Sequence, residues 1–202
     1  SGGTSSKSRE HGHDHGHGEA TGGDGRDGQA LDPHLWLDPR NAIAFTRAVA
    51  DTLARVDPAH AAAYRRNAAA RVERLRALDD ALAASLAPVA DRPYLVFHDA
   101  YQYLEARYGL AAAGSITVDP GRPPGARRLG ALRERIRAGD IRCLFVEPQF
   151  EPGIARTIAE GTGARVATLD PLGAELEPGA ELYFDLMRAL ARDLRGCLLG
   201  GG

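Results

Sequence analysis

Three side chains that could bind a metal or move a proton directly follow short apolar runs in the sequence. They are His98 after residues 94–97, Glu147 after residues 144–146, and Asp170 after residues 166–169. In an open parallel sheet, ligands bind outside the carboxyl ends of the strands, so we expect these three residues to face one crevice. One imidazole and two carboxylates are suitable metal ligands or hydrogen-bond partners of such ligands.

His34 is a fourth candidate, in Asp32-Pro-His-Leu-Trp-Leu-Asp-Pro39. Each candidate also has a purely structural interpretation. His98 can cap the next helix, whereas Glu147-Pro and Asp170-Pro-Leu-Gly are typical of strand ends and turns. His34 can be an ordinary surface histidine, and His60, beside alanines in a helical pattern, is expected to be solvent-exposed.

A histidine-rich, acidic stretch lies within residues 1–30, where the only hydrophobic residues are Ala20 and Ala30. Such a segment buries too little apolar surface to offset its ordering entropy, which predicts a flexible arm. Its centre carries four alternating histidines, which are His11, His13, His15 and His17. Alternating histidines with acidic neighbours are typical of weak zinc capture, and the alternative is an inert polar linker.

The helices and strands that must position these groups can be predicted from Asp-Pro pairs and from the periodicity of apolar residues. Asp38-Pro39 begins a helical pattern whose apolar residues are Ile43, Phe45, Val49, Leu53 and Val56. Asp57-Pro58 begins a second, long helix that ends near Pro88, because Asp and Pro are favoured at a helix start. Short apolar strands then alternate with helices to the chain end. This alternation predicts an α/β fold with a mostly parallel sheet and helices on both faces.

Composition excludes several classes of protein. The formal charge of −2, from 25 basic and 27 acidic residues, argues against a nucleic-acid binder. No stretch reaches the roughly 18 apolar residues of a membrane helix, and because no basic start with an apolar run is present, we expect any secretion signal to have been removed or to lie outside this sequence. Nucleophile-elbow, Walker and dinucleotide-binding motifs are absent from the sequence. A zinc hydrolase stays open, with His34, His98 and Asp170 as ligands and Glu147 as general base.

The two cysteines, Cys143 and Cys197, are too few for a structural zinc site and too far apart for a redox pair. A disulfide that joins the last helix to the sheet is the economical interpretation. Closing a loop of that length would contribute about 4 kcal/mol on the chain-entropy model and implies an oxidising compartment. Two buried free thiols are the alternative.

Several motifs in one order resemble the zinc-binding solute-binding proteins of bacterial ABC importers, the cluster A-I metal-binding family. They are the histidine-rich acidic stretch, Asp32-Pro-His-Leu-Trp-Leu-Asp-Pro39, the long helix after Asp57-Pro58, Phe97-His-Asp-Ala-Tyr101, Gly114-Ser-Ile-Thr-Val-Asp-Pro120, Phe145-Val-Glu-Pro-Gln-Phe150 and Thr168-Leu-Asp-Pro-Leu-Gly173. The resemblance extends from the arm to the last helix. It implies a binding protein rather than an enzyme, which carries Zn²⁺ outside the cytoplasm and delivers it to an ABC permease.

The resemblance also implies roles for individual residues. His34 and His98 match the family's histidine ligands, and Asp170 matches a carboxylate that ligates in manganese-binding relatives. Imidazole at position 98 favours Zn²⁺ over Mn²⁺. Glu147 is expected beside the ligands rather than on the metal, the arm matches a zinc-gathering loop, and Cys143 with Cys197 matches a disulfide of the zinc branch.

In this comparison the chain corresponds to the C-terminal two-thirds of such a protein. The expected segments are a flexible arm (1–30), a remnant of the N-terminal lobe (31–56), a rigid linking helix (57–88) and a complete C-terminal α/β lobe (89–202). We expect a monomer in the periplasm or another extracytoplasmic compartment, with no nucleic-acid partner. The remaining alternative in this class is a zinc-buffering fragment that binds only through its histidine arm.

Overall fold

The computed structural model describes residues 32–117, 124–139 and 141–200. Their elements, in chain order and with 3-10 turns written η, are η1 (Leu35–Leu37), α1 (Pro39–Val56), η2 (Pro58–His60), α2 (Ala61–Leu86), η3 (Ala87–Val89), β1 (Tyr94–His98), α3 (Gln102–Tyr108), β2 (Ala112–Thr117), α4 (Ala126–Ala138), β3 (Cys143–Val146), α5 (Gly153–Ala159), β4 (Arg165–Thr168) and α6 (Leu182–Leu199). The histidine arm lies outside the described residues.

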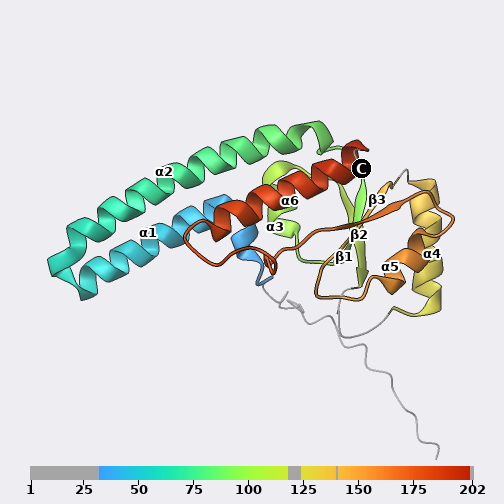
Figure 1. Cartoon of the computed structure of the whole chain (residues 1–202), viewed down its shortest axis with the longest axis horizontal. Coiled ribbons are helices and arrows are strands. Elements are labelled where there is room, and N and C mark those ends of the chain that lie inside the picture. Colours follow the sequence, from blue (N-terminus) through green and yellow to red (C-terminus); the bar gives the residue numbers. More distant parts are fainter. Residues whose placement is uncertain (1–31, 118–123, 140, 201–202) are drawn as a thin grey trace, which may run out of the picture. The chain divides into compact units, whose positions relative to one another are not determined.

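The two Asp-Pro pairs begin helical structure, as the sequence predicts. The Asp38 carboxylate accepts the Arg40 backbone N–H at 2.8 Å and so caps α1. Asp57 instead accepts from the His60 ring at 2.8 Å, and a 3-10 turn precedes α2. The expected long helix is therefore one α-helix with a 3-10 turn at each end. Figure 1 shows α1 and α2 running side by side as a hairpin that projects from the sheet.

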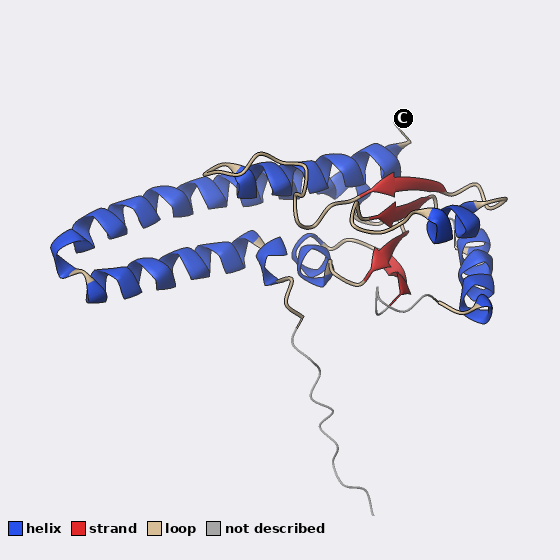
Figure 2. Cartoon of the chain, turned by 60° about the horizontal axis from the view of Figure 1, so that its bottom comes forward, coloured by secondary structure: helices blue, strands red, loops and turns tan. Residues whose placement is uncertain are grey.

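The four strands form one parallel sheet in the order β2-β1-β3-β4. The register pairs Tyr94 with Cys143 and Cys143 with Arg165, so these strands begin at the same edge. Parallel strands that begin together also end together, which brings the residues after them to one edge of the sheet. Figure 2 shows that the sheet lies between two groups of helices, with α2 and α6 on one side and α4 and α5 on the other. The predicted α/β class is confirmed.

Alternating strand residues divide the core into two layers. Tyr94 and Val96 of β1 pack with α2, α3 and α6, whereas Leu95 and Phe97 pack with α4 and α5. Near-continuous apolar strands are typical of a parallel sheet that is covered on both faces. The end of β1 is therefore held by apolar packing on both sides, which makes it a rigid base for His98.

The apolar residues of α1 lie differently from those of the other long helices. Phe45 is 67% exposed and Val56 is 72% exposed, and Val49 and Leu53 are also exposed. Instead α1 buries the small residues Ala50 and Ala54 and packs beside α2. Small side chains let two helices approach closely, so the larger residues on the neighbouring face of α1 are left in solvent.

None of the helices in the described part of the chain has the length and apolar character needed to span a membrane.

Cys143 and Cys197 form a disulfide, with their Cα atoms 6.1 Å apart. The bond joins the first residue of β3 to the last turn of α6, and both cysteines are buried. The disulfide alternative is therefore confirmed, and the free-thiol alternative is wrong. Cys143 faces the same core layer as α6 because odd-numbered residues of β3 point to that side.

Candidate metal centre

His98 is the last residue of β1, and Glu147 directly follows the adjacent strand β3. The Nδ1 atom of His98 lies 3.1 Å from Glu147 Oε1. The side chain of Glu147 is only 5% exposed. The hydrogen bond to Glu147 raises the pKa of His98 above its usual value and outweighs the opposing effect of burial. The pairing of β1 with β3 therefore brings together two residues that the sequence placed after separate apolar runs.

His34 directly precedes η1 and has an equivalent partner in Asp32. Its Nδ1 atom lies 2.6 Å from Asp32 Oδ1, which also accepts the His34 backbone N–H at 2.9 Å. Burial alone would raise the pKa of Asp32, but hydrogen bonds from His34 and Gln102 outweigh burial and lower that pKa. Asp32 is therefore ionised at neutral pH. Because a carboxylate only accepts hydrogen bonds, the hydrogen of a neutral His34 ring lies on Nδ1.

The two imidazoles meet although they are far apart in the sequence. The ring centroids of His34 and His98 are 5.1 Å apart, and their planes are inclined at 66°. No hydrogen bond within the described part of the chain involves the Nε2 atom of either ring. A carboxylate on Nδ1 with a free Nε2 lone pair is the arrangement found in many zinc-binding histidines. These two residues therefore suit Nε2 ligation of a zinc-type ion.

Aromatic rings border the two histidines. Trp36 lies 5.3 Å from His34, and Phe150 lies 6.3 Å from His98, between ring centroids. Phe150 also stacks on Phe97 at 4.9 Å. The side chains of His34 and His98 are only 15% and 18% exposed. A partly dry surrounding of this kind strengthens the interaction between an imidazole nitrogen and a cation.

Asp170 follows β4 at the same edge, but its carboxylate is bound to its own loop. Oδ1 accepts the Leu172 N–H at 3.0 Å, and Oδ2 accepts the Ala174 N–H at 2.6 Å. Gln149, two residues after Glu147, also donates from Nε2 to Oδ1 at 3.3 Å, which connects Asp170 to the loop after β3. Among the residues that the structure describes, no group of three His, Cys, Asp or Glu side chains surrounds a metal position.

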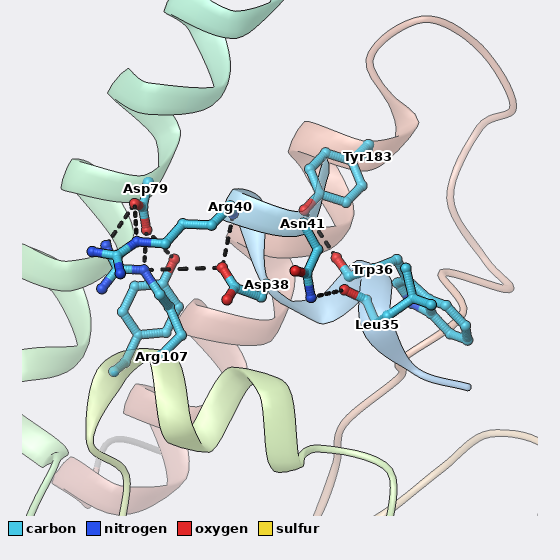
Figure 3. Close-up of polar contacts among 9 residues, drawn as sticks. Leu35, Trp36, Asp38, Arg40, Asn41, Asp79, Arg107 and Tyr183 are labelled. Atoms are coloured by element: carbon cyan, nitrogen blue, oxygen red, sulfur yellow. Dashed lines mark hydrogen bonds and ion pairs between the residues drawn. The ribbon is translucent and has the colours of Figure 1, made fainter. Parts of the chain in front are cut away.

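The turn that carries His34 is anchored by contacts from several elements (Figure 3). Trp36 Nε1 donates to the Pro171 carbonyl at 3.0 Å, and the Tyr183 hydroxyl donates to the Trp36 carbonyl at 2.9 Å. The side chain of Asn41 donates to the Leu35 carbonyl at 2.9 Å. These bonds connect η1 to α1, to α6 and to the loop after β4.

A buried ion-pair cluster beside η1 strengthens this anchoring. Arg107 of α3 makes two hydrogen bonds to the Asp79 carboxylate of α2, at 2.9 and 2.5 Å. The Tyr108 hydroxyl donates to the same carboxylate at 2.9 Å. Arg107 also lies 4.0 Å from Asp38, the N-cap residue of α1. Figure 3 shows this cluster joining α1, α2 and α3 at one point.

The sequence did not single out the residues that hold His34. Asp32 stands in the motif of residues 32–39 but was given no role there, and Gln102 and Tyr103 lie 70 and 71 residues from it, outside any motif. The only available signal was the Asp-x-His spacing, which allows a local hydrogen bond of this type. The four arm histidines, His11, His13, His15 and His17, lie outside the described residues.

Comparison with known proteins identifies the family. The family model described as "ZnuA: Zinc-uptake complex component A periplasmic" matches residues 2–197. The "High-affinity zinc uptake system protein ZnuA" of Brucella abortus (strain 2308) is 51% identical over 167 residues, which cover 83% of this chain and 50% of the relative. The relative is named as part of an uptake system rather than as an enzyme, in agreement with the predicted binding protein.

Two solved structures extend the comparison. A ZnuA deletion mutant with zinc bound has a TM-score of 0.71 and 29% identity, covering 84% of this chain and 62% of that chain. The binding protein FpvC from Pseudomonas aeruginosa, in complex with Mn²⁺, has a TM-score of 0.71 and 28% identity, with coverages of 84% and 64%. This chain spans about half the length of the Brucella relative. Because the family model matches nearly the entire length of this chain, the chain belongs to the ZnuA family of zinc-uptake binding proteins.

Proposed function

We propose that this chain binds Zn²⁺ through His34 and His98 and serves high-affinity zinc uptake by delivering the ion to an ABC permease. The observation that carries the proposal is the pair of imidazoles 5.1 Å apart, each with Nδ1 directed to a carboxylate. Similarity to the zinc-uptake protein of Brucella abortus and to a zinc-bound ZnuA structure supports the choice of ion. The disulfide agrees with a periplasmic or other extracytoplasmic location.

Two imidazoles fill two of the four positions of a tetrahedral zinc ion and leave two to be filled. Asp170 is a candidate for one of them, because it follows β4 at the same edge of the sheet. Its hydrogen bonds with Leu172 and Ala174 fix the orientation of a carboxylate that keeps lone pairs for an ion. Water is the alternative ligand. The Mn²⁺ complex of FpvC shows that this fold also accepts manganese. Imidazole at both positions favours zinc, because Mn²⁺ prefers oxygen ligands.

The zinc-hydrolase alternative required Glu147 as a general base for a metal-bound water. Glu147 is instead buried, and its Oε1 atom lies within hydrogen-bond distance of His98 Nδ1. A carboxylate in this role orients the ligand and fixes its tautomer. This geometry favours Glu147 as the partner of a ligand, and it favours a protein that binds and releases the ion without chemistry on it.

Zinc calorimetry on the full chain tests the proposal against the arm-only alternative. The background carries His11→Gln, His13→Gln, His15→Gln and His17→Gln, which removes every arm imidazole. We expect one zinc site to persist in this background and to be lost on further substitution of His98→Ala. His60→Ala is the matched control, since His60 is exposed and distant from the pair in the helical hairpin.

Two results would contradict the proposal. Complete loss of zinc binding in the arm-substituted background would assign the binding to the arm. Equal affinity in the His98→Ala and His60→Ala variants would show that the imidazole pair does not hold the ion. Competition between Zn²⁺ and Mn²⁺ in the same background measures the selectivity, which we expect to favour zinc.

A further inference from the structure

We infer that Asp32 and Gln102 are positioning residues for His34, so that the single β1–α3 unit sets the placement of both imidazoles. His98 is the final residue of β1, and α3 begins with Gln102 after a three-residue connection. Gln102 therefore reaches His34 through Asp32, whereas His98 is placed by the strand itself. The zinc consequences of this inference rest on the proposed function, but the positioning itself does not.

The first step of the argument is the double use of the Asp32 carboxylate. Oδ1 is engaged locally by His34, through the ring Nδ1 at 2.6 Å and the backbone N–H at 2.9 Å. Oδ2 accepts a hydrogen bond from a residue that is distant in the sequence, since Gln102 Nε2 donates to it at 2.5 Å. One carboxylate thus joins the histidine ring on one side to the start of α3 on the other. Its side chain is only 10% exposed, so water competes weakly for these bonds.

The second step is that α3 holds the same residue at its backbone. The Tyr103 hydroxyl donates to the Asp32 carbonyl at 3.3 Å. Two consecutive residues of α3, Gln102 and Tyr103, therefore form hydrogen bonds with the side chain and the main chain of Asp32, respectively. Two contacts on one residue restrict both its position and its rotation, which a single hydrogen bond does not.

The third step is the rigidity of the connection between α3 and His98. Tyr101 lies between them, is 1% exposed, and donates its hydroxyl to the Leu169 carbonyl at 2.8 Å. Leu104 of α3 is buried in the same core layer as Val96 of β1. The helix and the strand therefore move as one body, and the spacing of the two imidazoles follows from it.

The test separates a positioning role from a general role in folding. It uses a substitution that favours the helix α3 but weakens the contact between α3 and Asp32. Gln102 is the first residue of α3, where a negative charge is favourable for the helix. Gln102→Glu preserves the shape of the side chain but directs a second carboxylate at Asp32. It should therefore leave the helix intact and weaken the hold on His34. Asp32→Asn removes the charged acceptor directly, and Ala106→Gln on the same helix is the matched control.

The first measurement is the tautomer of His34 in the metal-free full chain at pH 8, by long-range proton–nitrogen NMR correlation. Replacing the four arm histidines by Gln leaves only His34, His60 and His98 to assign. We expect the Nδ1–H tautomer at His34 in this background and in Ala106→Gln. Asp32→Asn and Gln102→Glu should shift His34 toward Nε2–H, while His98 stays unchanged because Glu147 holds it.

The second measurement is zinc affinity, for which we expect a loss of about 10- to 100-fold in Asp32→Asn and a smaller loss in Gln102→Glu. An unchanged His34 tautomer in both variants would overturn the inference. So would a shift in Ala106→Gln of the same size. If the parent chain binds no zinc but the tautomers change as expected, the proposed function fails and the positioning inference stands.

Discussion

His34 and His98 present the same chemical group from two different kinds of structure. His98 ends a strand whose residues pack against helices on both faces of the sheet. His34 precedes a 3-10 turn of three residues, in which Leu37 is buried in the core and side-chain hydrogen bonds reach α3, α6 and the loop after β4. One ligand is therefore placed by a strand packed on both faces, whereas the other depends on polar contacts in addition to the burial of Leu37. The difference indicates that substitutions can disturb one imidazole without the other.

The largest effect should come from removing the disulfide, which joins α6 to β3, the strand that pairs with β1. Cys143 and Cys197 are separated by 54 residues, so replacing both with Ser should lower the free energy of unfolding by about 4 kcal/mol. Chemical denaturation of the oxidised parent and the double variant measures this difference. Because packing still holds β1, the NMR signals of both imidazoles should persist in the folded variant. Loss of the His98 signal alone would show that the disulfide, rather than packing, places this ligand.

A slightly smaller effect is expected on the His34 side. Arg107→Ala leaves the buried Asp79 carboxylate with the Tyr108 hydroxyl and the exposed Arg40, whose Nε lies 3.9 Å away and compensates the charge only in part, which should cost about 3 kcal/mol of stability. The His34 ring signal should change more than that of His98, because the cluster lies beside η1. Adding Asp79→Asn should recover part of the loss, since it removes the uncompensated charge. Equal changes at both rings would contradict the separation of the two regions.

Tyr101 tests the connection between the two regions. Tyr101→Phe removes the donor to the buried Leu169 carbonyl and should lower stability by about 1–2 kcal/mol. Thermal unfolding measures this loss. Because Tyr101 joins β1 to α3, both imidazole signals should shift together, in contrast to Arg107→Ala. A shift at only one ring would show that β1 and α3 do not move as one body.

The smallest effect concerns pH and the base of α3. Burial raises the pKa of Glu105 to about 7, and its Oε1 accepts from the Tyr94 hydroxyl at 3.2 Å. Between about pH 5 and 7 the folded chain therefore binds more protons at Glu105 than the unfolded chain, whose pKa is near the ordinary 4.5. Stability should fall as pH rises through this range, by about 1 kcal/mol after discounting for partial exposure. Denaturation between pH 5 and 8 measures this slope, which Glu105→Gln should flatten.

Much of the fold could be predicted because its signals are local. Asp-Pro pairs and the apolar runs of the strands act over a few residues, and they located α1, β1 and β3 closely. The exposed apolar face of α1 could not be predicted, because periodicity identifies an apolar face but not what covers it. The same limit applies to Asp170, whose position after β4 was predictable but whose hydrogen bonds to its own loop were not.

The sequence by itself determined that His98 and Glu147 come directly after apolar strand runs of a mostly parallel sheet, since these patterns are short-range. That β1 and β3 are neighbours is a property of the folded sheet. Only the tertiary structure decided that His34 lies against His98 and that Asp32 meets Gln102, 70 residues away. Contacts of this kind depend on how helices and turns pack on the sheet, and a polar pair leaves no periodic signal in either segment. The part of the candidate site that lies at the strand ends can therefore be predicted from the sequence, and the part that depends on side-chain contacts cannot.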